Sequence, residues 1–226
     1  MMVGFVSPLY VRPLQIEHMS PAQQANLEES VDAICDSLVW SWRYYYALEG
    51  LHEGSKANGD RLQPVGAFLL CVWTGMFEAL LAKASQVIDS TKNVHSFYYL
   101  FKKTRSYITD DDELKKIVND DESLLKGKVP ERILNWRNNR ISHLSSHGRN
   151  DDFFSQNHMQ LTEIQDFLKL CEEMLNRYAN RLLGMVINTE SGGYGLQMEG
   201  LQLLSPRPAE QFLPGDSEKA ALFLRP

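Results

Sequence analysis

The sequence has few cysteines and lacks the short motifs of most catalytic classes. Its three cysteines, at positions 35, 71 and 171, lie in apolar segments and form no CxxC pair. An odd, unpaired set argues against a disulfide framework and fits a reducing cytosol. The sequence also lacks a GxxxxGK phosphate loop, a GxSxG motif and a clear pair of catalytic carboxylates. It therefore offers no support for a nucleotide hydrolase, an esterase or a glycosidase.

Signals for export or membrane insertion are also missing. Residues 1–15 contain no basic region followed by an uninterrupted apolar run, so we expect no secretory signal. The most hydrophobic segment, 65–82, includes Glu78 and two glycines. This composition favours a buried central helix over a membrane span. We predict a cytoplasmic protein that does not associate with a membrane.

The charge is unevenly distributed. The formal net charge is −6, which disfavours a general nucleic-acid binder. Residues 126–149, however, hold six Lys or Arg and one acid, so this segment carries +5 and the remainder −11. An acidic run, 110–122, lies just upstream. Solvated surface explains the acidic run, whereas the basic segment is equally consistent with surface and with a site for an anion.

Helical periodicity dominates the chain, and strand signals are weak and confined to the ends. Ser20, Pro21 and Gln23 form a helix start with a capping box, and Gly50 or Gly54 is the predicted stop before a polar loop. Further helices are predicted over 65–89, 96–108, 113–118, 130–146 and 162–187, the last opened by a second capping box at 162–165.

These elements predict an all-α, up-down helical bundle of four or five principal helices with short extra helices. We assign residues 20–190 to this domain and residues 1–19 to an N-terminal segment. Residues 191–226 contain several glycines and prolines, and they are predicted to form an irregular tail that is flexible or packs on a partner.

One residue in the 130–146 helix conflicts with its surroundings. On a helical wheel Arg137 falls near the middle of the apolar arc and Arg140 falls inside it. Burying a guanidinium without a partner is costly, so Arg137 must snorkel, pair with an acid or face a wet, anion-binding groove. Asp89, at the end of the second helix, is either such a partner or the cap of the following turn, and capping is the favoured role.

His143 lies six residues after Arg137, about 9 Å along the axis and about 120° around it. The two side chains cannot meet on one straight helix. They can share a site only if the helix bends or if a second copy of the helix supplies the opposing residues. A twofold dimer would do so, because the same surface meets itself.

The segment Arg137-Asn138-x4-His143 resembles the signature of the HEPN superfamily. The wider layout over residues 21–187 is similar to the AbiU2 branch of these domains, with an apolar second helix ending at Asp89. The resemblance implies a homodimeric helical bundle, often a metal-independent endoribonuclease in toxin–antitoxin or phage-defence systems. A partner protein such as an antitoxin is then expected.

By this resemblance, His143 would move protons, Arg137 would hold the phosphate, and Asn138 would orient one of them. The predicted contacts to the RNA backbone are Arg140, Lys128 and His147. No cofactor and no metal are expected.

Some HEPN toxins have a modifiable tyrosine two residues after the histidine, but here that residue is Ser145, so the resemblance gives no support for such a modification. Two alternatives remain open. Some members are non-catalytic dimerisation or interaction modules. His143 and His147 also have the i, i+4 spacing of a metal site, with Asp151 or Asp152 as a third ligand. The lack of an HExxH glutamate makes the metal site the less favoured reading.

Overall fold

The computed structural model describes residues 19–62, 65–108, 111–141, 151–185 and 187, and within them the chain is all-helical. Seven α-helices and two short π-helical segments follow one another: α1 (Pro21–Leu62), α2 (Gly66–Val87), α3 (Phe97–Tyr107), α4 (Asp112–Leu124), α5 (Lys128–Trp136), η2 (Arg137–Ile141), α6 (Asp151–Gln156), α7 (Leu161–Tyr178) and η4 (Ala179–Leu183). The prediction of an all-α helical bundle is confirmed.

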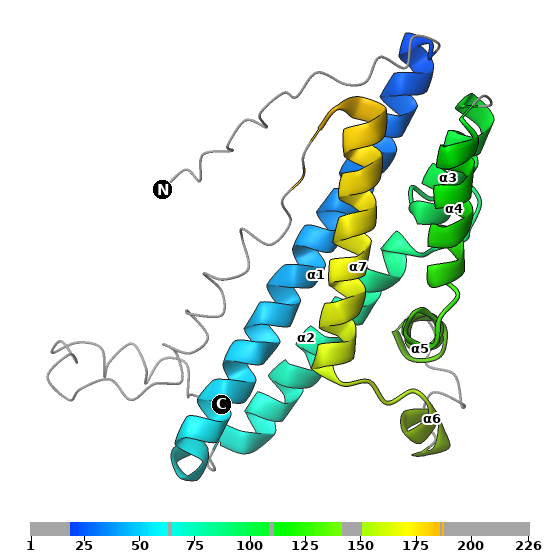
Figure 1. Cartoon of the computed structure of the whole chain (residues 1–226). Coiled ribbons are helices and arrows are strands. Elements are labelled where there is room, and N and C mark those ends of the chain that lie inside the picture. Colours follow the sequence, from blue (N-terminus) through cyan, green and yellow to red (C-terminus); the bar gives the residue numbers. More distant parts are fainter. Residues whose placement is uncertain (1–18, 63–64, 109–110, 142–150, 186, 188–226) are drawn as a thin grey trace, which may run out of the picture.

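The longest helices lie side by side. α1 packs against α2, α7 and α3, and α3 in turn pairs with α4 (Figure 1). α5 and α6 lie below this pair. The end of the α1–α2 hairpin projects beyond the other helices, so the core is concentrated toward the opposite end of α1 (Figure 1).

The start of α1 is as predicted, but its end is not. Ser20 N–H donates to Gln23 Oε1 at 2.8 Å, which is half of the predicted capping box. The helix then continues through Gly50 and Gly54, both buried, to a kink at Asn58. The predicted loop after Gly50 is therefore wrong. A glycine inside a helix costs only about 1 kcal/mol, and packing against α2 outweighs that preference.

α2 is central over half of its length only. Its buried residues all lie between Phe77 and Val87, whereas Phe68 is 68% exposed and Leu70 is 66% exposed. The expectation of a wholly buried helix is thus wrong for the first three turns. Among the described helices, α2 alone has the length and composition to cross a membrane. This is weak evidence for a membrane span, because the core helices of soluble proteins share these properties.

The other helices differ from the prediction mainly at their ends. α3 matches the segment predicted over 96–108 and is capped by Ser96. α4 is twice as long as expected and begins at the N-cap Asp111, whose carboxylate accepts the Leu114 N–H. α7 is capped by Gln160 and Glu163 rather than by a box at 162–165. Its α-helical part stops at Tyr178, and Gly184 ends η4 in the left-handed conformation that glycine adopts without strain.

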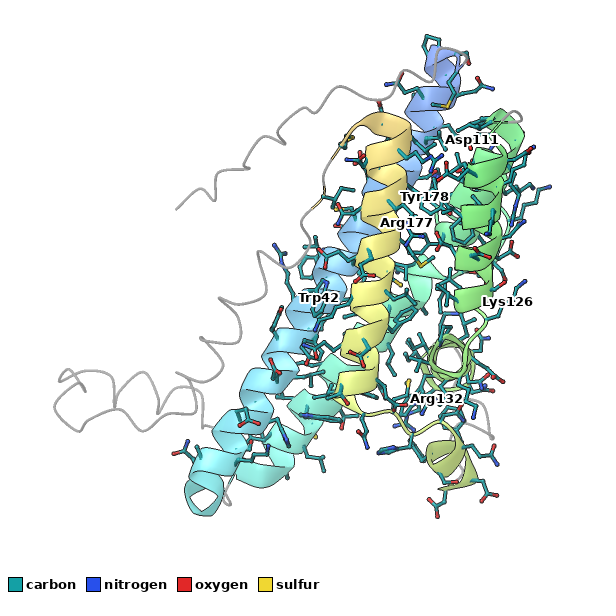
Figure 2. The ribbon with its side chains drawn as sticks, in the orientation of Figure 1. Trp42, Asp111, Lys126, Arg132, Arg177 and Tyr178 are labelled. Carbon is teal, nitrogen blue, oxygen red and sulfur yellow. The ribbon has the colours of Figure 1, made fainter. Side chains whose placement is uncertain are left out.

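An ion pair between an exposed arginine and a buried carboxylate ties α7 to α4. Arg177 Nη1 donates to Asp121 Oδ1 at 2.7 Å, and the Asp121 side chain is only 2% exposed. Arg177 and the buried Tyr178 come from α7, on the side near α4 (Figure 2). The pair fixes α4, and through it α3, against the α1–α7 face.

Candidate functional site

A cleft opens where the last turns of α2 meet η2. It has a volume of about 390 Å³ and is lined by polar and small side chains: Ala82, Ser85, Gln86, Asp89, Thr91, Arg137, Asn138 and Ile141. Two residues of the predicted motif, Arg137 and Asn138, therefore face one hollow with the end of α2. Arg137 pairs there with Asp89, and pairing with an acid is one of the three situations that allow an arginine in an apolar arc.

The Arg137 guanidinium is held on two of its three nitrogens. Nη1 donates to Asp89 Oδ2 at 2.5 Å, and Nε donates to Asn138 Oδ1 at 3.0 Å. The Arg137 side chain is 25% exposed and that of Asp89 is 16% exposed. Within the described part of the chain, no acceptor binds Nη2. The arginine is thus held by its two neighbours where it lines the cleft.

Asp89 both pairs with the arginine and turns the chain. Its Oδ1 accepts the Thr91 N–H at 2.8 Å, so the capping and pairing roles considered separately for this residue occur together. Burial alone would raise the pKa of Asp89, but the hydrogen bonds from Thr91 and the Arg137 charge outweigh it and lower the pKa. The carboxylate is therefore ionised at neutral pH and keeps its hold on the guanidinium.

The helix that carries the motif is anchored by Trp136. The indole Nε1 donates to the Asn157 carbonyl at 2.9 Å, and the ring packs edge-on against Phe77 and Phe153. Arg132 also ties α5 to α7, through an ion pair with Glu163 at 2.6 Å. Because the residue before Arg137 is fixed in the core, the direction in which Arg137 leaves the helix is fixed too.

The motif helix is not one straight α-helix. α-Helical geometry begins at Lys128, two residues before the predicted start, and ends at Trp136, where the π-helical segment η2 follows. The Asn139 side-chain amide donates to the Asn135 carbonyl at 3.1 Å and competes with the backbone N–H that an α-helix would direct there. The wheel angle between Arg137 and His143 therefore does not hold beyond Trp136. Single π-turns of this kind often occur at functional sites.

A comparison with known protein families identifies the domain. The family model of the AbiU2-type HEPN domain matches residues 24–191. This chain belongs to the AbiU2 family of HEPN domains. The match spans the helices from α1 to η4, including the cleft and the complete Arg-Asn-x4-His sequence. No curated protein and no solved structure gives a significant match to the chain.

The other residues predicted for the site lie in different parts of this HEPN domain. Arg140 Nε pairs with Glu78 at 3.1 Å, and its guanidinium stacks over the Phe154 ring, so it braces η2 against α2 and α6. Lys128 is exposed at the start of α5, about 14 Å along the helix from Arg137, and it does not line the cleft. His143 and His147 lie outside the described residues. The structure thus brings together Arg137 and Asn138 but leaves Lys128 apart from them.

Sequence reasoning named Asp89 but missed how the rest of α2 takes part in the site. Glu78 and Gln86 are polar residues on a helix that is otherwise strongly apolar, and Asp89 follows its end. Their spacings of eight and three residues place them on one side of α2, which is the side that meets η2. A polar stripe on an apolar helix was the signal that could have identified them.

No metal centre is apparent in the described part of the domain. No three His, Cys, Asp or Glu side chains come together there in a way that could hold an ion. The proposed ligands Asp151 and Asp152 are both exposed on α6, while His143 and His147 lie outside the described residues. The metal alternative is therefore neither supported nor tested by these contacts.

Proposed function

We propose that this AbiU2-family HEPN domain is a metal-independent endoribonuclease, acting in the cytoplasm as a toxin or phage-defence effector. The observation that carries the proposal is the Arg137 side chain, which Asp89 and Asn138 position in the lining of a polar cleft. The complete Arg-Asn-x4-His sequence of the family, which ends at His143, supports it. A partner encoded with it, such as an antitoxin, would restrain its activity.

Arg137 suits the role of a phosphate ligand. A guanidinium binds a phosphate by parallel hydrogen bonds and remains charged at any physiological pH. The Asp89 carboxylate and the Asn138 amide hold it in one orientation, so little reorganisation is needed when charge develops on the phosphate. Asn138 is exposed and is therefore also within reach of a bound substrate.

His143 follows η2 by two residues and would transfer protons. One histidine removes the proton from a ribose 2′-OH, whose oxygen then forms a bond to the adjacent phosphorus. The bond from phosphorus to the 5′-oxygen breaks, and a second histidine protonates that oxygen. The products are a 2′,3′-cyclic phosphate and a 5′-OH. In a homodimer, the two copies would supply the base and the acid.

We assign this dimer to the first half of α2, residues 66–76, which the other described helices leave bare. Large apolar side chains are exposed at Val65, Phe68 and Leu70, and exposed apolar patches of this kind mark interaction surfaces. Gly75 has no atom within 4 Å of the position that a Cβ would take, so another backbone can approach α2 there. Cys71, Gly75 and Ala82 follow one side of the helix, and Ala82 already lines the cleft. A second copy lying along this side would therefore reach the Arg137 site.

The ribonuclease proposal is tested by cleavage in the absence of free metal. Purified protein incubated with structured and single-stranded RNA in EDTA should produce fragments ending in a 2′,3′-cyclic phosphate, identified by mass spectrometry. His143→Ala protein, purified in the same way, should cleave at least about 100-fold more slowly, because general acid–base catalysis contributes about 10²–10⁴-fold. No cleavage by either protein, or equal cleavage by both, would disprove the proposal.

The dimer is tested by Phe68→Glu. Phe68 is already 68% exposed in one chain, so the substitution should leave the fold intact while placing a charge in the proposed interface. We expect a shift toward monomer in sedimentation experiments and a parallel loss of RNA cleavage. Alkylation of the exposed Cys71 should slow as wild-type protein concentration rises. Leu124→Glu, at a 51% exposed apolar residue on α4, is the matched control. Monomeric wild-type protein, or an unchanged dimer in the Phe68→Glu variant, contradicts this assignment.

A second candidate function is a non-catalytic interaction module. The partly buried ion pair between Arg137 and Asp89 favours it, since the same contact would explain a purely structural arginine. In that case the bare half of α2 would serve docking alone. The two functions predict different effects of an Arg137 substitution: loss of both cleavage and stability for a ribonuclease, and loss of stability alone for an interaction module.

A further inference from the structure

A second pocket adjoins the Arg137 cleft and is rich in lysine. It has a volume of about 360 Å³ and is lined by the α2–α3 loop and one side of α3: Asp89, Ser90, Thr91, Lys92, Asn93, Tyr98, Tyr99, Lys102, Lys103 and Ser106. Asp89 and Thr91 line both hollows, so the two adjoin one another. In a protein with a formal net charge of −6, three lysines at one hollow are a marked local excess.

No described carboxylate forms an ion pair with the lysines of this pocket. Among the described residues, no carboxylate lies within 4.0 Å of the amino groups of Lys92, Lys102 or Lys103. The one acid in the lining, Asp89, already directs one oxygen to Thr91 and the other to Arg137. The pocket thus presents three uncompensated ammonium groups to an incoming ligand.

Local contacts hold Lys92 and Lys103 in position at this pocket. Asn93 adopts the left-handed conformation, with φ at 65°, and closes the turn that carries Lys92. The Lys103 ammonium lies 5.1 Å from the centre of the Tyr99 ring and 5.6 Å from that of Tyr107. Hydrogen bonds to the Tyr107 and Tyr99 hydroxyls also raise the pKa of Lys103, so this lysine stays charged at neutral pH.

The number of cations suits a chain of phosphates rather than a single anion. Arg137 lines one hollow, whereas Lys92 on the loop and Lys102 and Lys103 on α3 line the adjoining one. Single-stranded RNA has one phosphate per nucleotide, and proteins that bind it without sequence preference use positively charged grooves that follow its backbone. The loop and α3 thus add three cations beside the hollow that Arg137 lines.

We propose that Lys92, Lys102 and Lys103 form a binding site for the RNA backbone that continues the strand held at Arg137. This inference rests on the proposed ribonuclease function, because it assigns the path of that substrate on one side of the scissile phosphate. It places the strand across the turn between α2 and α3, which carries none of the predicted RNA-binding residues.

The test measures binding and cleavage separately. Binding uses a fluorescein-labelled, fully 2′-O-methylated single-stranded RNA, which lacks the attacking hydroxyl, in anisotropy titrations at several salt concentrations. Cleavage uses the unmodified RNA. The variant combines Lys92→Gln, Lys102→Gln and Lys103→Gln. A control with the same charge change combines Lys56→Gln, Lys116→Gln and Lys169→Gln, none of which lines either hollow.

The pocket variant should bind about 10-fold or more weakly, and the slope of log K against log salt should fall by about 2, since each single-strand phosphate contact contributes about 0.7. The control and a triple lysine-to-arginine variant should bind like wild type. If wild type cleaves RNA and the pocket variant binds normally, this inference is wrong and the ribonuclease proposal stands. If the lysines govern binding but unmodified RNA is never cleaved, only the ribonuclease proposal fails. A wild-type protein that binds no RNA disproves the lysine site.

Discussion

Arg137→Ala is expected to slow RNA cleavage about 10²–10³-fold, the usual cost of removing one positioned donor from a developing anion. The residue supplies the cation of the cleft, and no other described cation lines it. Arg137→Lys should recover only part of the rate, because an ammonium cannot make the paired contacts of a guanidinium to Asp89, Asn138 and a phosphate at once. Single-turnover cleavage in EDTA measures the effect.

Stability must be measured on the same variants, because the substitution also leaves Asp89 without its ionic partner. The Asp89 carboxylate is 16% exposed and keeps its hydrogen bond to Thr91, so we expect Arg137→Ala to cost about 1–3 kcal/mol of unfolding free energy. Adding Asp89→Asn removes the unpaired charge and should restore most of that loss. Cleavage should stay low in this double variant.

The double variant separates the two candidate functions. If it recovers stability but not cleavage, Arg137 acts on the substrate. If no protein in the series cleaves RNA and the substitutions affect only stability, Arg137 is structural and the interaction module is the better description. Wild-type activity in Arg137→Ala would contradict the proposed role of this residue outright.

Arg177→Ala should be the most destabilising of the single substitutions considered for this bundle. It leaves the Asp121 carboxylate, 2% exposed, without the guanidinium that neutralises it. Although Arg177 itself is 42% exposed, its removal is expected to cost about 3 kcal/mol, because the Asp121 charge that it leaves behind stays buried. For a chain of this size that corresponds to a fall in Tm of roughly 10 °C. Thermal or urea unfolding followed by circular dichroism measures it.

Two further variants make the Arg177 result specific. Arg105 and Glu122 form a comparable pair, in which the arginine is 37% exposed, much as Arg177 is at 42%, but the carboxylate is 25% exposed rather than 2%. Arg105→Ala should therefore cost about 1 kcal/mol or less, as exposed pairs do. Adding Asp121→Asn to Arg177→Ala should restore part of the lost stability by removing the stranded charge. Equal losses from Arg105→Ala and Arg177→Ala would show that burial of Asp121 is not the cause.

The helical fold could be predicted because its causes are local. Apolar residues recurring every three to four positions define α1, α3 and α7, and the Ser20–Gln23 capping box marks the start of α1. The motif was also visible, because a charged residue in the apolar arc at Arg137 conflicts with the pattern around it. Each of these features depends on residues within a few turns of one another.

The errors arose where contacts across the fold overrule local preference. Gly50 would end an isolated helix, yet α1 passes through it because α2 packs alongside. The apolar pattern of α2 predicts burial along its whole length, but the other helices cover only its second half. Nothing local to these segments reveals how far a neighbouring helix extends.

The sequence by itself determined the helical class, the family and the arginine that conflicts with its surroundings, because composition, periodicity and short motifs are properties of neighbouring residues. The tertiary structure decided what that arginine faces. Asp89 lies 48 residues from Arg137, and the lysines of α3 join the same surface through a turn that follows Asp89. Sites of this kind form only when distant segments meet, so their geometry depends on packing energies that no local pattern encodes.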